Sequence, residues 1–133
     1  MIREKSCGAV VINDKNEVLL VKHNAGHISF PKGHVEKDES EIETAYREVL
    51  EETGIKIDIN GDIREVVTYS LKSNIIKDVV FFKARPISYD IRPQLEEISN
   101  AYFVDINEAL KKITYEDDRK VLKKMVGSGN DEY

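Results

Sequence analysis

Residues 40–54, SEIETAYREVLEETG, constrain the fold most, because they specify a helix together with both of its ends. Ser40 is a helix-capping residue type, and Glu43 three positions later completes the pattern of a capping box. Gly54 suits the left-handed position just beyond a helix. Between these ends, small or apolar residues recur every three or four positions and predict the buried face: Ile42, Ala45, Tyr46, Val49 and Thr53. The sequence therefore predicts an amphipathic helix over residues 40–53.

Apolar runs on both sides of this helix predict strands. Two of them flank the turn sequence NDKN, a pattern that predicts a hairpin. A long irregular loop, of a length that is usually functional, is expected between that hairpin and the helix, and Pro86 and Pro93 bracket another loop. The strands are predicted at 5–12, 17–23, 63–71, 75–84 and 101–104, the long loop at 24–39, further helices at 106–113 and 116–126, and a frayed end at 127–133. This irregular order predicts an α/β (α+β) fold with a mixed sheet between helices.

Length, charge and cysteine content exclude several classes of protein. At 133 residues the chain fits one domain, residues 1–133. Its net charge of −5 argues against a nonspecific nucleic-acid binder, so no stable nucleic-acid complex is expected. No apolar run approaches the roughly 18–20 residues that cross a bilayer, and no membrane association is expected. A single cysteine, Cys7, leaves no disulfide framework and favours a cytoplasmic location.

The glutamates of the predicted helix crowd its last two turns. Glu48, Glu51 and Glu52 repel one another by about 0.2–0.5 kcal/mol per pair, and the carbonyl end of a helix also disfavours anions. From the predicted buried face, Glu52 lies about 90° away, Glu48 about 130° and Glu51 nearly opposite. Carboxylates at such a rim can share a hard divalent cation such as Mg²⁺ or Mn²⁺. The alternative is a solvated acidic face on which Arg47 pairs with Glu43 and Glu51.

The segment FPKGH before the helix favours the metal-site interpretation. Lys32 and His34 flank Gly33, a residue that can expose its backbone to a ligand. Cations beside a metal-binding carboxylate cluster are what a polyphosphate substrate requires. The sequence therefore predicts a polyphosphate substrate for this site.

Residues 33–55 resemble the signature of the Nudix (MutT-like) hydrolase family, G-x5-E-x7-R-E-U-x-E-E-x-G-U, in which U is aliphatic. All nine defined positions match: Gly33, Glu39, Arg47, Glu48, Val49, Glu51, Glu52, Gly54 and Ile55. The resemblance implies a Nudix fold over residues 1–133. It also implies metal-dependent hydrolysis of a nucleoside diphosphate linked to another group.

By the same resemblance, individual roles pass to the matching positions. Glu48 and Glu52 are expected to be the principal metal ligands, with Glu51 in the same shell and the carbonyl of Gly33 facing the metal. A further ligand is expected at Glu97, with Glu96 as the alternative. Arg47 is expected to orient the glutamates and to pair with Glu39. Glu48 is the expected general base, and Glu51 and Glu97 remain alternatives.

Outside the signature, the segments SFPKGHVE, TYSLKSNIIKDVVFF and YEDDRKVLKK are similar to those of the asymmetrical diadenosine tetraphosphate hydrolases. This similarity implies hydrolysis to ATP and AMP. It assigns Lys32, His34 and Lys77 to phosphates, and Tyr69 and Tyr115 to an adenine. Three of these residues also have a structural alternative. Lys77 could be a solvated strand lysine, Tyr69 a core residue, and Tyr115 a residue that packs the start of a helix. Ile28 departs from the pattern, because many relatives have tryptophan at that position.

Two further activities stay open from the sequence. One is another Nudix reaction: removal of pyrophosphate from an RNA 5′ end, or cleavage of oxidised nucleotides or sugar nucleotides. The other is a non-catalytic domain that senses a nucleotide. Such domains usually lose signature glutamates, and this chain keeps all of them.

Overall fold

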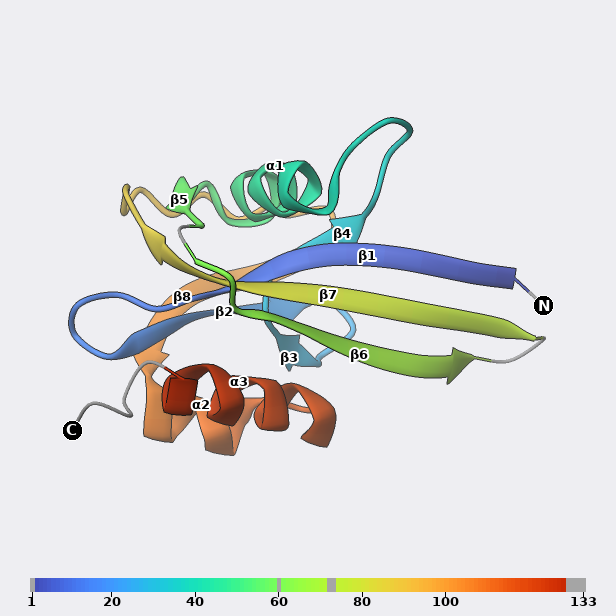
Figure 1. Ribbon diagram of the computed structural model, residues 1–133. Helices are drawn as coiled ribbons and strands as arrows, with labels where there is room; N and C mark the ends of the chain where they lie inside the picture. The colour runs from blue at the N-terminus through green and yellow to red at the C-terminus, as the bar shows by residue number, and fades with distance from the viewer. Residues whose placement is uncertain (1, 60, 72–73, 129–133) are drawn as a thin grey trace.

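The computed structural model describes residues 2–59, 61–71 and 74–128 and places two sheets between helices (Figure 1). The larger sheet has five strands in the order β4 (Lys32–His34), β1 (Ile2–Val11), β7 (Ile75–Pro86) and β5 (Ile57–Asp58), with β6 (Arg64–Leu71) also paired to β7. The smaller sheet has the order β3 (Ile28–Ser29), β2 (Glu17–His23) and β8 (Ile98–Asp105).

Helices lie on opposite sides of these sheets. Helix α1 (Glu41–Thr53) covers one side, and α2 (Ile106–Lys112) and α3 (Glu116–Ser128) cover the other (Figure 1). The larger sheet is mixed, because β1 runs parallel to β7 while its other pairings are antiparallel. The predicted fold class, a mixed sheet between helices, is confirmed. None of the helices in the described part of the chain is long and apolar enough to cross a membrane.

The second half of β1, from Ser6 to Val11, is buried on both faces, which explains why it holds only small and apolar residues. Val10 packs in the core beneath α2 and α3, whereas Ala9 and Val11 pack in the core beneath α1. The parallel pairing runs from Ile2 opposite Ile75 to Val11 opposite Ala84. This central pair of strands therefore supports both helical layers.

The predicted hairpin of residues 5–12 and 17–23 is wrong beyond its turn. The turn itself forms, since the Asn13 amide donates to the Glu17 carbonyl at 2.9 Å and Asn16 has a φ of 62°. One bridge, Ile12 with Val18, follows before the strands separate into different sheets. Both strands carry apolar residues on both faces, so each is covered more completely by pairing with distant strands.

Several predicted boundaries also need correction. The expected irregular loop contains β3 and β4, and β5 is an additional strand that the sequence did not indicate. Strands of two or three residues are too short to show a periodic pattern. The expected short strand at 101–104 is the eight-residue β8, and β7 continues through Pro86, which was expected in a loop. Helix α3 extends to Ser128. The rest of the predicted frayed end, 129–133, lies outside the described residues, as do residues 72–73 between the predicted strands 63–71 and 75–84.

Helix α1 has the predicted ends but a different buried face. The capping box of Ser40 and Glu43 is present, and Gly54 has a φ of 80°. Ile42 and Tyr46 are wrong as buried residues, being 43% and 36% exposed. The buried side chains are instead Thr44, Ala45, Val49, Glu52 and Thr53. The helix is rotated so that its small residues pack on β1, which brings the carboxylate of Glu52 into the interior.

Candidate active site

Arg47 organises the carboxylates of α1. Its Nε and Nη2 donate to the two carboxylate oxygens of Glu39 at 2.6 and 2.9 Å. Nη1 donates to Glu48 at 2.7 Å and to Glu51 at 3.1 Å, and Nη2 also donates to the carbonyl of His34 at 3.0 Å. One planar guanidinium thus links Glu39 of the preceding loop, the glutamates of α1 and the backbone of strand β4.

Glu39 is fixed in turn by the loop that precedes α1. Its Oε1 accepts hydrogen bonds from the Glu36 amide at 3.0 Å and from the Thr44 hydroxyl at 2.8 Å. The hydrogen bond from Arg47, followed by that from Glu36, lowers the pKa of Glu39 to about 2. The carboxylate therefore stays ionised and holds Arg47 in place.

Gly33 leaves the space in which Glu48 lies. A Cβ at position 33 would overlap the carboxylate of Glu48, so no other residue type fits there without moving that side chain. Burial raises the pKa of Glu48, and the hydrogen bond from Arg47 opposes that rise. The backbone of β4 and this carboxylate are consequently in direct proximity.

Glu52 is a buried carboxylate that faces the same strand. It is 4% exposed, and its Oε1 accepts a hydrogen bond from the Lys32 amide at 3.1 Å. Burial raises the pKa of Glu52 to about 7, and the charges of Glu48 and Glu97 add to the rise. The free energy of burying this charge indicates that a positive partner belongs beside it.

The loop before β8 is tied to the end of α1. The amide of Gln94 donates to the carbonyl of Glu52 at 3.0 Å, and the amide of Asn24 donates to the carbonyl of Glu97 at 2.8 Å. The charge of Glu97 is close enough to raise the pKa of Glu52. The structure therefore brings Glu97 towards the glutamates of α1.

The carboxylate oxygens of Glu48 and Glu52 are the type of ligand that a hard divalent cation prefers. The space that Gly33 leaves for the Glu48 side chain supports a metal site here. In the described ranges, however, no three acidic, histidine or cysteine side chains already converge on one point. The reason is visible in the ion pairs: Arg47 holds Glu48 and also Glu51, whose side chain is 49% exposed. The pair Glu48 and Glu52 therefore provides the core of the candidate metal site.

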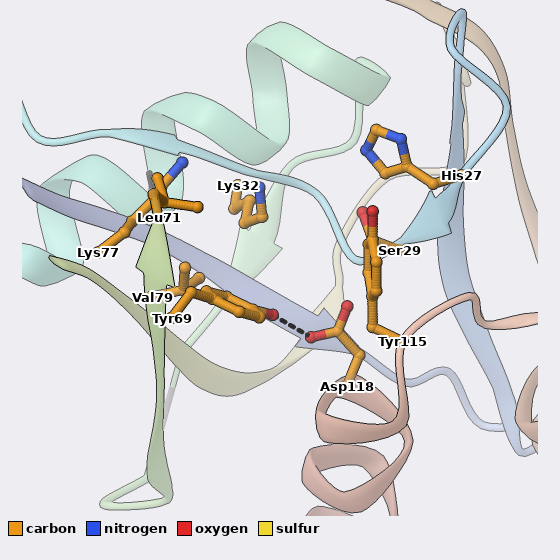
Figure 2. Close-up of a pocket in the computed structure, with 9 residues that line it drawn as sticks. All are labelled: His27, Ser29, Lys32, Tyr69, Leu71, Lys77, Val79, Tyr115 and Asp118. Carbon is orange, nitrogen blue, oxygen red and sulfur yellow. Dashed lines mark hydrogen bonds between the residues drawn. The ribbon is translucent and has the colours of Figure 1, made fainter. Parts of the chain in front are cut away.

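Figure 2 shows the residues that line a cavity of about 330 Å³, and this cavity is connected to the acidic cluster. Lys32 joins the two, because its amide contacts Glu52 while its side chain lines the cavity. Burial, and then the charge of Lys32, lowers the pKa of Lys77. The lining residues are His27, Ser29, Lys32, Tyr69, Leu71, Lys77, Val79, Tyr115 and Asp118.

Four of the five residues that the sequence assigned to substrate line this cavity: Lys32, Tyr69, Lys77 and Tyr115. His34 does not. Its side chain is exposed on β4, and its carbonyl accepts from Arg47 instead. Tyr69 is half-buried and packs against the core, whereas Tyr115 is 47% exposed.

Three polar residues that line the cavity, His27, Ser29 and Asp118, were not predicted from the sequence. His27 stacks on His23 with ring centroids 3.9 Å apart and lies 5.9 Å from the ring of Tyr115. It forms part of an aromatic wall beside Ile28. Asp118 could not be recognised from the sequence as a cavity residue, because an acidic residue in the first turn of a helix is ordinarily explained by the helix dipole.

Comparison with known proteins agrees with this geometry. A family model described as the NUDIX domain matches residues 3–125. The asymmetrical bis(5′-nucleosyl)-tetraphosphatase of Rattus norvegicus is 31% identical over 89% of this chain and 90% of its own length. An 8-oxo-(d)GTP phosphatase of Mycolicibacterium smegmatis is 32% identical over 74% of this chain, but the matched part is only 30% of that protein.

Among solved structures, a C. elegans Ap4A hydrolase binary complex superimposes with a TM-score of 0.84 at 27% identity. The match covers 94% of this chain and 96% of the other. Fold, signature geometry and family model agree, and the chain belongs to the Nudix hydrolase family.

Proposed function

We propose that this Nudix hydrolase cleaves diadenosine tetraphosphate asymmetrically, to ATP and AMP. The observation that carries the proposal is a cavity lined by two tyrosines and two lysines, one of which, Lys32, also donates its backbone amide to the buried carboxylate of Glu52. Aromatic rings bind an adenine by stacking, and ammonium groups bind phosphates. The rat and nematode proteins, to which the chain is similar over most of its length, support the same substrate.

Glu48 and Glu52 would hold Mg²⁺, or Mn²⁺, with Glu51, Glu97 and the carbonyl of Gly33 as additional ligands. Such a cation neutralises phosphate charge and lowers the pKa of a bound water. Lys32 and Lys77 bind phosphate oxygens and offset the charge on the leaving group. His34 is not assigned to phosphate binding, because its exposed side chain lies outside the lining of the cavity.

Glu48 acts as the general base in this proposal. It has a fixed position between Gly33 and Arg47, and its partial burial favours proton uptake. Glu51 and Glu97 are the alternatives, since both are more exposed to water. Water attacks one of the two phosphorus atoms of the cleaved anhydride, and Glu48 takes a proton from it. The bridging P–O bond breaks, and AMP and ATP separate, one carrying the oxygen from water and the other the former bridging oxygen. The proton passes from Glu48 to the former bridging oxygen or to solvent.

A second candidate is the hydrolysis of oxidised nucleoside triphosphates. The similarity to the mycobacterial 8-oxo-(d)GTP phosphatase favours it, over a smaller part of the chain. Both activities cleave a phosphoanhydride and would use the same residues of the acidic cluster. The two substrates differ in the group at the far end of the phosphate chain, which is a second adenosine in diadenosine tetraphosphate.

Product analysis separates these candidates. The protein is incubated with Mg²⁺ and diadenosine tetraphosphate, 8-oxo-dGTP, a sugar nucleotide or a 5′-triphosphorylated RNA, and the products are resolved by ion-exchange chromatography. Equal amounts of ATP and AMP, abolished by EDTA, are expected from diadenosine tetraphosphate. Turnover of another substrate in preference to it would overturn the substrate assignment and retain the Nudix reaction.

Glu52→Gln tests the reaction itself, with Glu51→Gln as its matched control on the exposed side of the same turn. Glu52→Gln should lose about 100-fold or more in kcat with its fold intact, because it removes a buried ligand charge. Glu51→Gln should lose less. A sensor domain would instead bind nucleotide without turnover in the unmodified chain.

A further inference from the structure

One group in the cavity has no role in the proposed reaction. Asp118, in the first turn of α3, is 1% exposed and yet lines the cavity beside the tyrosines. The Tyr69 hydroxyl donates a hydrogen bond to its Oδ1 at 3.2 Å. Figure 2 shows the other carboxylate oxygen directed away from Tyr69 and into the cavity. This oxygen is available to a ligand.

Holding Tyr69 does not by itself explain a carboxylate at this position. A buried phenol needs a hydrogen-bond acceptor, and a neutral amide oxygen supplies one without a charge to bury. Burial raises the pKa of Asp118, while the Tyr69 hydrogen bond and the charges of Lys32 and Arg119 favour its ionised form. The ionised group is an acceptor only, which restricts what it can bind to hydrogen-bond donors.

The position of Asp118 relative to the aromatic rings indicates which donor it meets. Tyr115 immediately precedes α3 and Asp118 lies in its first turn, and both residues line the cavity. Lys32 and Lys77 reach the cavity from the strands β4 and β7 instead. A nucleotide with its phosphates at the lysines and its base against the tyrosines therefore presents the edge of the base to Asp118.

We propose that Asp118 is a specificity-determining residue that accepts a hydrogen bond from the amino group of the bound base. This inference rests on the proposed function for the placement of the nucleotide. It selects bases with an exocyclic amino group, such as adenine, over purines that lack one. A hydrogen bond to a charged acceptor supplies roughly a tenfold preference.

The test measures binding without catalysis, so that it does not depend on the metal. Isothermal titration calorimetry of the full chain in EDTA uses AMP and purine riboside 5′-monophosphate, which differ only in the amino group. The Kd for AMP is expected to be about tenfold lower. Equal affinities would overturn the inference, and this comparison needs no variant.

Asp118→Asn sharpens the result. The amide keeps an oxygen for Tyr69 and turns an NH₂ donor into the cavity, so the variant is expected to lose its preference for AMP and to gain affinity for IMP, whose base presents a carbonyl. Tyr69→Phe is the matched control: it removes the phenol but leaves the carboxylate, and it should retain the preference for AMP. An unchanged preference in Asp118→Asn would mean that the residue only holds Tyr69.

Two remaining outcomes are distinguishable. In the first, the protein binds 2′-deoxy-AMP more weakly than AMP only when Asp118 is present, and it binds AMP and purine riboside 5′-monophosphate equally well. That result would assign the carboxylate to the ribose and overturn the inference. Selective binding of AMP by a protein that does not cleave diadenosine tetraphosphate would support the inference while the proposed substrate fails.

Discussion

Single side chains decide the geometry of the acidic cluster, and Arg47 has the largest influence. Its guanidinium hydrogen-bonds Glu39, Glu48 and Glu51 and the carbonyl of His34. A lysine at this position carries the same charge but lacks the planar arrangement of donors, so it cannot make these bonds together. The charge of residue 47 matters less than its shape.

Arg47→Lys should therefore lower kcat by about 10–100-fold while the free energy of unfolding changes little. Released from Arg47, Glu48 and Glu51 no longer share a fixed orientation. Steady-state kinetics and urea unfolding of the same preparations measure both effects. Glu36→Gln is the control, because its carboxylate lies 3.7 Å from Arg47 and is 68% exposed. A full retention of kcat in Arg47→Lys would contradict the orienting role.

At this scale, the sequence predicted residue types better than residue environments. The Glu39–Arg47 pair that the signature implied is present in the structure. The order of burial, with Glu52 the most buried and Glu51 the most exposed, also follows from helical spacing. Asp118 could not be identified, because its partner Tyr69 is 49 residues away and only the fold brings them together.

Among the elements, α1 carries most of the local information in the sequence. The Glu43 amide donates to the Ser40 hydroxyl at 3.1 Å, and the Ser40 amide donates to the Glu43 carboxylate at 2.8 Å. At the other end, Gly54 adopts its left-handed conformation and donates to the carbonyl of Leu50 at 2.8 Å. These contacts fix where the signature helix starts and stops, and so which turn carries the glutamates.

Ser40→Ala should destabilise the protein by about 1 kcal/mol, because the amide of Glu43 loses its hydrogen-bond acceptor. Chemical unfolding in urea, with an unchanged m-value, measures this loss. Glu43→Gln keeps an oxygen that can accept from the Ser40 amide and should change stability by less than half as much. Equal losses in the two variants would show that the cap does not act through these bonds.

Strands were harder to predict than helices. Each helix expected from the sequence is present, because caps and apolar spacing involve residues within four positions of one another. The partner of a strand is not specified in this local way. The predicted hairpin failed because β2 pairs with β8, and β1 pairs with β4 and β7.

At the scale of the whole molecule, ion pairs join α1 to both strands beneath its first turn. Glu41 accepts from Lys5 of β1 at 2.8 Å and from Arg64 of β6 by two hydrogen bonds of 2.8 Å. The bond from Arg64, with a smaller contribution from Lys5, holds the pKa of Glu41 at about 2, below its ordinary value of 4.5. The helix that carries the site is thus anchored electrostatically to the larger sheet.

This pKa shift predicts a pH dependence of stability. Because the folded state binds a proton at Glu41 less readily than the unfolded state, the stabilisation is present above about pH 4.5 and is lost as the pH falls towards 2. A double-mutant cycle of Glu41→Gln and Arg64→Gln should give a coupling free energy of about 0.5–1 kcal/mol at pH 7. The coupling should be smaller at pH 3 than at pH 5, measured by urea unfolding. A coupling that grew on acidification would contradict the assignment.

By itself, the sequence determined the signature helix, its ends, the residues of the acidic cluster and the family to which the chain belongs. These depend on residue identities and on contacts between near neighbours in the chain, which spacing and capping rules describe. The tertiary structure decided the rest: the parallel pairing of β1 with β7, the rotation of α1 that buries Glu52, and the cavity that Tyr69 and Asp118 line together. The physical reason is that strand pairing and cavity shape depend on contacts between distant segments, which form only when both faces of the sheets are covered.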